Sequence, residues 1–431
     1  MSLLAAARYQ MAIPEGVTGI DGAIIFPAGV PAPTLLRRKQ STLVKKYPHL
    51  ARRLLDPQLY LAELNPSRCR ASCVNLASYG WFGDSHVEAY DSKKMTQADW
   101  RTKSKAKIHS TWTSLAPSGQ KAVHTSISVC VATQKALGCE ALILPSPLTV
   151  DASTDYSAEL GWLDEGLRVA AKLAPGIPRL TTIAVSDTCL RGIDPTSNSL
   201  LDLILDQVVA RNTEGAYVVL EQANEHGYYC SHPNTIGSLL RLTQGLKGAG
   251  VNRVVVAFAG VAGLLATCVG ADDWCTGWYR GERRLRLADH EDQTGRANPT
   301  FYSHGLASEF HLQLDLDRAV EKGFLKRIED DTQASAGLMK ALRANRRVAS
   351  VPDWAYSQSN VAAAKEHFMT AMARETTKLT ASGPSQRLLY AKTWLEGAAK
   401  LAADLYTLGG LNPRTELDHQ DGWLRAWNAL P

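Results

Sequence analysis

The sequence of 431 residues lacks the features that mark membrane and secreted proteins. No apolar run approaches the roughly 18 residues that a membrane-spanning helix needs. The first residues, Met-Ser-Leu-Leu-Ala-Ala-Ala-Arg, form too short an apolar stretch for a secretory signal peptide. We therefore predict a soluble, cytoplasmic protein without a membrane partner.

Cysteine is sparse, and its eight positions are scattered along the chain. Cys69 and Cys73 form the only close pair, and neither a Cys-x-x-Cys motif nor a His/Cys quartet occurs. Scattered cysteines in a long chain are typical of reduced thiols. This pattern predicts no structural metal site.

Nucleotide-binding signatures are also missing. No Gly-x-Gly-x-x-Gly motif lies between an expected strand and an expected helix, and no Walker-type loop occurs. We therefore predict no cofactor. The net charge of +5 is compatible with a nucleic-acid partner but does not require one.

What the chain does contain is a rhythm of short apolar runs that alternate with amphipathic stretches. The clearest runs are residues 141–144, 180–185, 216–220 and 254–258. Runs of this length are typical of strands buried on both faces of a parallel sheet. Repeated strand–helix units predict a (β/α)8 barrel, with an open α/β sheet as the alternative. In a barrel, the active site lies at the carboxyl ends of the strands.

The regions around these runs predict further elements. Residues 19–26 indicate a first strand, and residues 58–62 a second strand that ends at Glu63 and Asn65. Between them, residues 35–55 carry seven Lys and Arg among leucines, which predicts a basic amphipathic helix with a solvated face. Residues 65–107 form a long connection, which is typical of a functional or a disordered loop. Helices are expected at residues 118–138, 156–173, 199–212, 234–247 and 264–269, and a strand or strand–loop at 270–278.

Beyond about Pro299 the pattern becomes helical. Residues 306–330, 333–346, 358–380 and 384–407 are rich in Ala, Leu, Lys, Arg and Glu at helical spacing. We expect residues 1–300 to form the barrel and residues 301–431 a helical C-terminal region. That region is a candidate surface for a homodimer or a protein partner.

Polar residues that follow two of the runs are candidates for chemistry. Glu221, Gln222 and Asn224 follow the run at 216–220, and Asp187 follows the run at 180–185. Carboxylates and amides in this position can hold a base edge or a sugar and move a proton. The alternatives are a polar barrel rim for the first three residues and a helix cap for Asp187.

Two adjacent carboxylates and a thiol lie in the last expected strand, and Asp272 or Asp273, like Asp187, is a catalytic candidate that would serve the sugar at the barrel mouth. Because neighbouring strand residues point to opposite faces, Asp272 and Asp273 cannot both face the barrel lumen. Cys275 is a candidate nucleophile if nearby arginines stabilise its thiolate. The alternative is a small buried apolar residue.

Aromatic, basic and glycine residues near this strand suggest binding. Bases stack on residues such as Tyr279, and arginines such as Arg280 and Arg283 hold phosphates. The alternative is a salt-bridged edge. Gly260 and Gly263 follow the run at 254–258 and are candidates for a phosphate cradle, although barrel packing also uses such glycines.

Four segments, taken together, resemble the tRNA-guanine transglycosylases and their relatives, which exchange a base in tRNA or DNA. The segments are Gln134–Ala141, Thr182–Val185, Glu214–Val218 and Ala266–Cys275 with Tyr279-Arg280, and their order and spacing fit over residues 120–285. The resemblance implies a barrel that performs glycosidic-bond chemistry on a nucleoside at its mouth.

The resemblance also maps site positions onto this chain. The aspartate with which that family attacks the sugar falls on Cys275, and an acidic residue at the end of an earlier strand falls near Ser146. The strand with its Asp-Ser-Gly motif would end at Glu63-Leu64-Asn65, and its zinc ligands are absent. The sequence therefore predicts a diverged relative that acts on or binds a nucleoside in tRNA or DNA. The alternatives are a catalytically silent barrel that binds nucleic acid or a protein, and an enzyme of a small phosphorylated metabolite.

Overall fold

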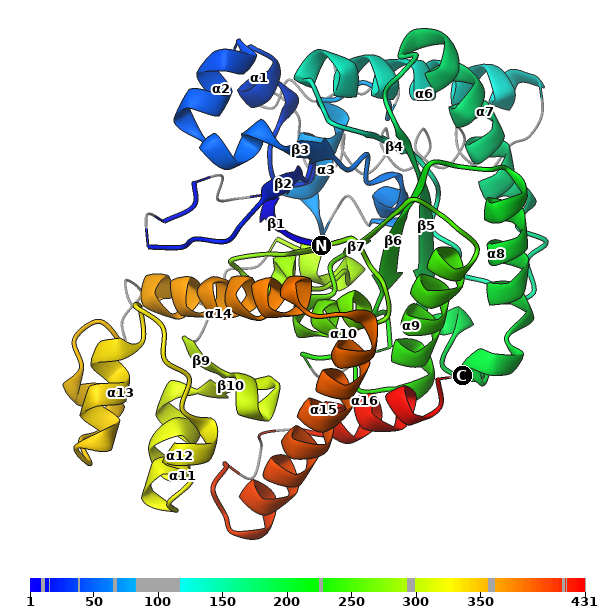
Figure 1. Ribbon diagram of the computed structural model, residues 1–431. Helices are drawn as coiled ribbons and strands as arrows, with labels where there is room; N and C mark the ends of the chain where they lie inside the picture. Colours follow the sequence, from blue (N-terminus) through cyan, green and yellow to red (C-terminus); the bar gives the residue numbers. More distant parts are fainter. Residues whose placement is uncertain are drawn as a thin grey trace.

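The computed structural model describes the chain except residues 9–11, 15, 38, 65–67, 83–116, 225–227, 293–298, 356–360, 413–414, 416 and 431. Eight parallel strands form one sheet in the order β3-β2-β1-β8-β7-β6-β5-β4, surrounded by helices (Figure 1). The edge strands β3 and β4 approach each other, because Glu140 N–H donates a hydrogen bond to the Arg53 carbonyl oxygen at 3.0 Å. The predicted (β/α)8 barrel is thus confirmed. The strands are β1 Ser2–Ala7, β2 Gly22–Ile25, β3 Arg53–Leu55, β4 Leu142–Leu144, β5 Arg179–Ser186, β6 Gly215–Glu221, β7 Arg253–Ala257 and β8 Asp273–Thr276.

The central strands are buried on both faces, which explains their unbroken apolar runs. In β6, Tyr217 and Val219 lie beside Val255 and Ala257 of β7 and share their buried core. The residues between them, such as Val218, belong to a second core together with the outer helices. Side-chain alternation therefore places Tyr217, Val219 and Glu221 on the inner face of the barrel.

The five helices expected between residues 118 and 269 are confirmed, with ends shifted by a few residues. They pack outside the strands, most of them through an apolar stripe on one side, whereas every residue of the last one is buried. They are α6 Pro117–Leu137, α7 Ser157–Leu173, α8 Ser199–Ala210, α9 Pro233–Gly248 and α10 Gly263–Cys268.

The N-terminal quarter differs from its prediction. The first strand is β1, whose Ser-Leu-Leu-Ala-Ala-Ala sequence favours a helix locally but pairs with β2 and β8. The expected basic helix over residues 35–55 is wrong: the structure has α1 Ala32–Leu36, α2 Gln40–Lys46 and then β3. Pro48 stops α2, because proline cannot continue a helix. The expected strand at 58–62 is instead the 3-10 helix Leu59–Glu63, and α3 Arg70–Ala77 follows it.

The C-terminal region begins with an antiparallel hairpin, β9 Thr300–Ser303 and β10 Ser308–His311. The expected helix at 306–330 is therefore wrong in its first part, since residues 308–311 pair with β9. The helices at 333–346, 358–380 and 384–407 are confirmed in their described parts. The helices of this region are α11 Asp317–Glu321, α12 Leu325–Ile328, α13 Ala336–Arg343, α14 Val361–Ala381, α15 Pro384–Thr407 and α16 His419–Asn428.

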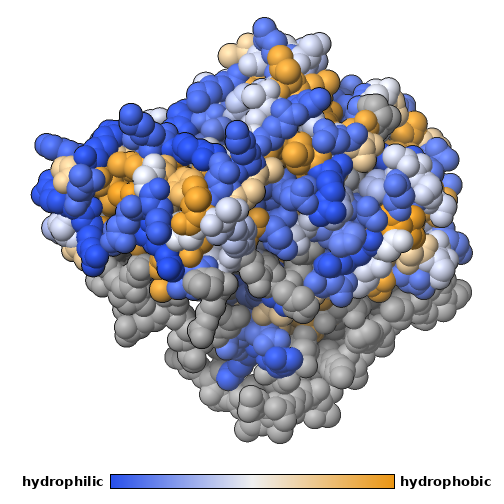
Figure 2. Space-filling model, turned by 90° about the horizontal axis from the view of Figure 1, so that it is seen from below, coloured by the Kyte–Doolittle hydropathy of each residue, from blue (hydrophilic) through white to orange (hydrophobic). Residues whose placement is uncertain are grey.

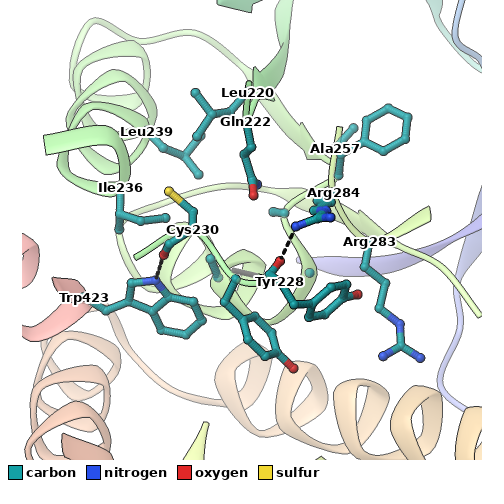
Figure 3. Close-up of a pocket in the computed structure, with 15 residues that line it drawn as sticks. Leu220, Gln222, Tyr228, Cys230, Ile236, Leu239, Ala257, Arg283, Arg284 and Trp423 are labelled. Atoms are coloured by element: carbon teal, nitrogen blue, oxygen red, sulfur yellow. Dashed lines mark hydrogen bonds between the residues drawn. The ribbon is translucent and has the colours of Figure 1, made fainter. Parts of the chain in front are cut away.

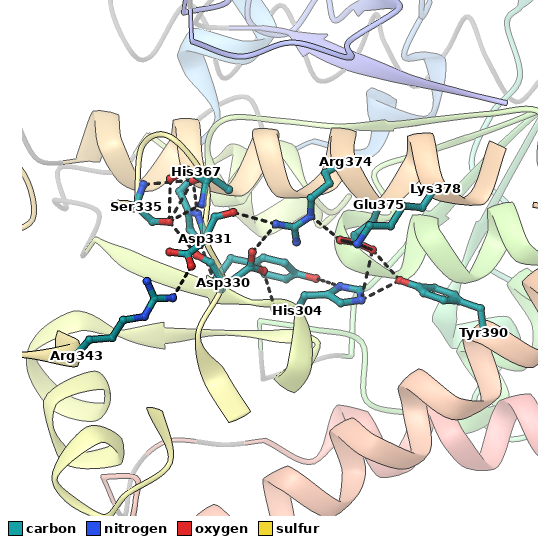
Figure 4. A network of polar contacts seen from close by, with 12 residues as sticks. His304, Asp330, Asp331, Ser335, Arg343, His367, Arg374, Glu375, Lys378 and Tyr390 are labelled. Carbon is teal, nitrogen blue, oxygen red and sulfur yellow. Dashed lines mark hydrogen bonds and ion pairs between the residues drawn. The ribbon is translucent and has the colours of Figure 1, made fainter. Parts of the chain in front are cut away.

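Helices α14 to α16 join this region to the barrel, because α14 packs against β1 and α10 and α16 packs against α9. A buried polar network ties α14 and α15 to the hairpin (Figure 4). Tyr390 Oη donates to Glu375 Oε2 at 3.0 Å and contacts His304 Nε2 at 2.8 Å, and Arg374 pairs with Asp330 at 2.7 Å. A division of the chain at residue 300 stays a prediction.

Most of the described residues seen from below are hydrophilic, with hydrophobic spots between them (Figure 2). Among the large apolar side chains that the structure describes, Leu389 and Leu408 are the most exposed. None of the described helices is both long enough and apolar enough to cross a bilayer.

Candidate active site

Glu221 is the last residue of β6 and lies beside Ser186, the last residue of β5. Ser186 Oγ donates a hydrogen bond to Glu221 Oε2 at 2.6 Å, and the Glu221 side chain is buried. Burial raises the pKa of Glu221, the Ser186 hydrogen bond opposes this, and the negative charge of Asp187 raises it further. A buried carboxyl group with a raised pKa at the carboxyl end of a barrel is suited to transfer protons.

Asp187 is fully buried directly after β5. Its carboxylate accepts hydrogen bonds from the Asn224 backbone N–H at 3.1 Å and from Asn224 Nδ2 at 2.9 Å. Capping does not explain its position, because Ser186 supplies the side-chain cap for Thr188 N. Asp187 and Asn224 therefore link the loops after β5 and β6, and Asp187 lies close enough to Glu221 for its charge to raise the pKa of that residue.

Sequence reasoning missed Asp56, which comes directly after β3 and is fully buried. Its carboxylate accepts hydrogen bonds from Tyr217 Oη at 2.7 Å, from Gln58 N at 2.9 Å and from the Tyr60 hydroxyl. Burial raises the pKa of Asp56 to about 6, although these three hydrogen bonds oppose the shift. The signal was present in the sequence: with the strand placed at Arg53–Leu55, Asp56 is the first residue at its carboxyl end.

A buried guanidinium lies after β1. Arg8 Nη1 donates to the Gly281 carbonyl oxygen at 3.0 Å, and Arg8 Nη2 contacts His290 Nδ1 at 2.8 Å. Burial, and then the charge of Arg8, lowers the pKa of His290 well below its usual value, so His290 is neutral and accepts from Arg8. Glu282 is buried on a neighbouring turn, where its carboxylate accepts from Tyr279 N at 3.1 Å.

The carboxyl end of the barrel thus gathers four buried carboxylates and a buried arginine from segments far apart in the chain. Taking charges out of water is costly, and clustered groups whose pKa values are shifted by burial are candidates for chemistry. The carboxylates are Asp56, Asp187, Glu221 and Glu282. No group of three or more His, Cys, Asp or Glu among the described residues is arranged to hold a metal ion.

Cys275 lies in the barrel interior and is buried. Burial raises the pKa of its thiol well above the usual value, and the negative charges of Asp56 and Glu282 raise it further. A thiolate is therefore disfavoured, and the geometry supports the alternative of a small buried residue over a nucleophile.

Asp272 and Asp273 lie at the amino end of β8, away from Glu221. Asp273 is buried and pairs with Arg52 at 2.9 Å and with Arg253 at 2.7 Å, whereas Asp272 pairs with Lys247 at 2.9 Å. The expectation that they serve the sugar at the barrel mouth is wrong, because β8 begins at Asp273 and runs from there towards the mouth.

The basic segment after β8 is attached to the hairpin. Arg283 is buried and pairs with Glu309 Oε1 at 2.9 Å, and Arg280 lies 3.6 Å from Glu309 Oε2. Burial raises the pKa of Glu309, but Arg283 and Arg280 outweigh it and lower this pKa to about 2. The ring of Tyr279 is covered by the Lys365 ammonium at 3.8 Å. The salt-bridged edge is thus the better interpretation, and phosphate binding by these arginines gains no support.

Gln222 shares a cavity with Leu220, whose side chain belongs to the core formed with the outer helices. It lines a small cavity with Leu220, Trp423 and the end of β7, and Figure 3 shows its amide between Cys230 and Arg284. The cavity of about 20 Å³ has room for about one water molecule. An expected base contact that combines Glu221 with Gln222 therefore gains no support from this arrangement.

The two glycines of the expected phosphate cradle have other surroundings. Gly260 lines the same cavity, which is too small for a phosphate group. A Cβ atom on Gly263 would lie 2.1 Å from the Trp274 ring, so this glycine is required for packing. The phosphate expectation is not supported.

Three candidates remain to be placed. Ser146 is buried after β4, and its hydroxyl lies 3.4 Å from the Pro147 carbonyl oxygen. Glu63 ends the 3-10 helix after β3, and only its backbone is described. Asn65 lies outside the described residues, as does most of the expected 65–107 loop.

The sequence matches no protein-family model and no curated protein.

Proposed function

We propose that this chain is a barrel enzyme that breaks or exchanges the glycosidic bond of a nucleoside in tRNA or DNA. The observation that carries the proposal is the buried Glu221 carboxyl, whose pKa is raised and which lies beside Asp187 at the carboxyl end of the barrel. Glycosidic-bond cleavage needs such a pair, since one group protonates the departing base and another stabilises positive charge on the sugar.

In this proposal Glu221 donates its proton to the departing base as the glycosidic bond breaks. The carboxylates of Asp187 and Asp56 stabilise the positive charge that develops on the sugar. Water, or an incoming base, then forms the new bond to the sugar carbon and returns a proton to Glu221. The target base must leave its stack to reach these groups.

A base-release assay tests the proposal directly. Wild-type protein is incubated with tRNA, single-stranded DNA, duplex DNA and free nucleosides, and the released bases are measured by chromatography. A parallel reaction with labelled free bases detects exchange. Release or exchange on at least one substrate is expected. No reaction on any of them contradicts the proposed chemistry.

The rate should depend on pH through Glu221. Only the protonated carboxyl group can donate, so kcat/KM should fall as pH rises through the raised pKa of Glu221. The raised pKa keeps the donor protonated to higher pH than an ordinary glutamic acid. The measurement is the pH profile of base release on the best substrate. A rate that only increases with pH would mean that Glu221 is not the proton donor.

The catalytically silent barrel remains the second candidate. One observation favours it. Cys275 is buried as a thiol in the core, and it stands where the transglycosylases that the chain resembles have their nucleophile. This candidate predicts nucleic-acid binding without base release in the same assay.

A further inference from the structure

The stretch between Asp21 and Asp56 contains no acidic residue. It contains seven lysines and arginines, which gives this stretch a charge of +7 when histidine is neutral. Residues 100–139 form another long stretch without an acidic residue, and they carry six lysines and arginines. The seven are Arg37, Arg38, Lys39, Lys45, Lys46, Arg52 and Arg53.

Two of these cations have structural partners at the end of the barrel where the strands begin. Arg52 pairs with Asp273 and Glu140, and Arg53 donates hydrogen bonds to backbone carbonyl groups, including that of Leu137. Both side chains are therefore committed to holding β3 in place.

Four others, Arg37, Lys39, Lys45 and Lys46, are exposed, and among the residues that the structure describes none has a carboxylate partner. We call these four residues the basic lobe. Arg343 of the C-terminal region, by contrast, pairs with Glu329 and Asp331. The positive charge of the basic lobe is not neutralised within the described protein.

The basic lobe is compact. Arg37 directly follows α1, Lys39 precedes α2, and Lys45 and Lys46 end α2, which lies with α1 at the upper left of Figure 1. A helix of seven residues is about 10 Å long. Duplex nucleic acid carries one charge per roughly 1.7 Å of its axis, so about six phosphate charges lie along such a length. The four cations lie within ten consecutive residues, and α2 alone covers the length of about six phosphate charges.

We propose that the basic lobe binds the phosphate backbone of a nucleic acid. This inference rests on the proposed function in one respect, since it identifies the surface that would hold the polynucleotide while its nucleoside reacts at the barrel. A membrane is the less favoured partner. Leu36 is the one large apolar side chain that α1 and α2 expose among their described residues, which leaves little apolar area to insert into lipid.

The test is a binding titration of labelled tRNA and duplex DNA by fluorescence anisotropy at several salt concentrations. The variant carries Arg37→Ala, Lys39→Ala, Lys45→Ala and Lys46→Ala. If all four cations contact phosphates, the slope of log Kobs against log salt should become less negative by about 3 to 4 for duplex DNA, because each contact contributes about 0.9. The variant should also bind more weakly than the wild type at each of the low salt concentrations.

The matched control removes four exposed cations of the C-terminal region by Arg318→Ala, Lys322→Ala, Lys326→Ala and Lys340→Ala. This variant should keep the wild-type slope. An equal loss of affinity in both variants would show a general charge effect and overturn the proposal. The proposal also fails if the wild-type protein binds neither tRNA nor duplex DNA. It fails as well if the wild type binds anionic phosphatidylserine vesicles more tightly than nucleic acid.

The outcomes also separate this inference from the proposed chemistry. Any turnover of a free nucleoside should be unchanged in the basic-lobe variant, because α1 and α2 contribute none of the carboxylates at the barrel mouth. If wild-type protein binds nucleic acid through the basic lobe but releases no base, the chemistry fails and the binding surface stands.

Discussion

Replacing Asp273 by asparagine is expected to lower the free energy of unfolding by about 2 to 3 kcal/mol. Asp273 is buried at the foot of the barrel, where its carboxylate pairs with Arg52 and Arg253. Removing one member of a fully buried ion pair costs roughly 3–5 kcal/mol, because the remaining charge loses its partner. We expect less here because the two arginines are partly exposed to water.

The network around Asp273 explains why the loss should affect the whole barrel. Glu140 pairs with both Arg52 and Arg253, as Asp273 does. These four residues lie at the amino ends of β3, β4, β7 and β8, so their ion pairs connect four strands of the barrel. Burial raises the pKa of Asp273, but Arg253, Ser2 and Arg52 outweigh it and the pKa is lowered. Its contribution is therefore present at neutral pH and is lost as the pH falls through this lowered pKa.

The neighbouring residue supplies the control. Asp272→Asn removes the same charge one position earlier, from a partly exposed pair with Lys247. Such pairs contribute about 1 kcal/mol or less. Urea unfolding followed by circular dichroism at neutral pH compares the two variants. Equal midpoints for D272N and D273N would contradict the assigned role of the network.

Replacing Glu221 by glutamine is expected to reduce kcat for base release by at least about 100-fold on whichever substrate the wild type accepts. General acid catalysis typically contributes about 10²–10⁴-fold to a rate. Glutamine keeps the shape of the side chain and can still accept the Ser186 hydrogen bond, but it has no acidic proton. The loss should therefore appear without a change in stability.

The matched control is Glu214→Gln, because Glu214 directly precedes the first residue of β6, at the opposite end of the strand from Glu221. Glu214 is partly exposed and pairs with Arg179, so its loss should leave kcat almost unchanged. Stopped-time base-release assays and urea unfolding of both variants make the comparison. If E221Q turns over as fast as the wild type, and its rate still falls at high pH as the wild-type rate does, Glu221 is not the proton donor.

Much of the barrel was predictable because its central strands are buried on both faces. Residues 180–185 and 216–220 form unbroken apolar runs, and in a chain with repeated helices such runs are typical of the inner strands of a parallel sheet. The candidate carboxylates Asp187 and Glu221 followed from the same pattern, since a strand that is recognised also identifies the polar residues at its carboxyl end.

What the sequence by itself determined was therefore the alternation of strands and helices and the position of the polar residues that follow β5 and β6. Only the tertiary structure decided that β1 is a strand, that Asp56 meets Tyr217 inside the barrel, and that Arg283 is committed to Glu309. The physical reason is distance along the chain. Local patterns report burial and periodicity, whereas a charge or a strand edge acquires its role from a partner that folding brings from far away.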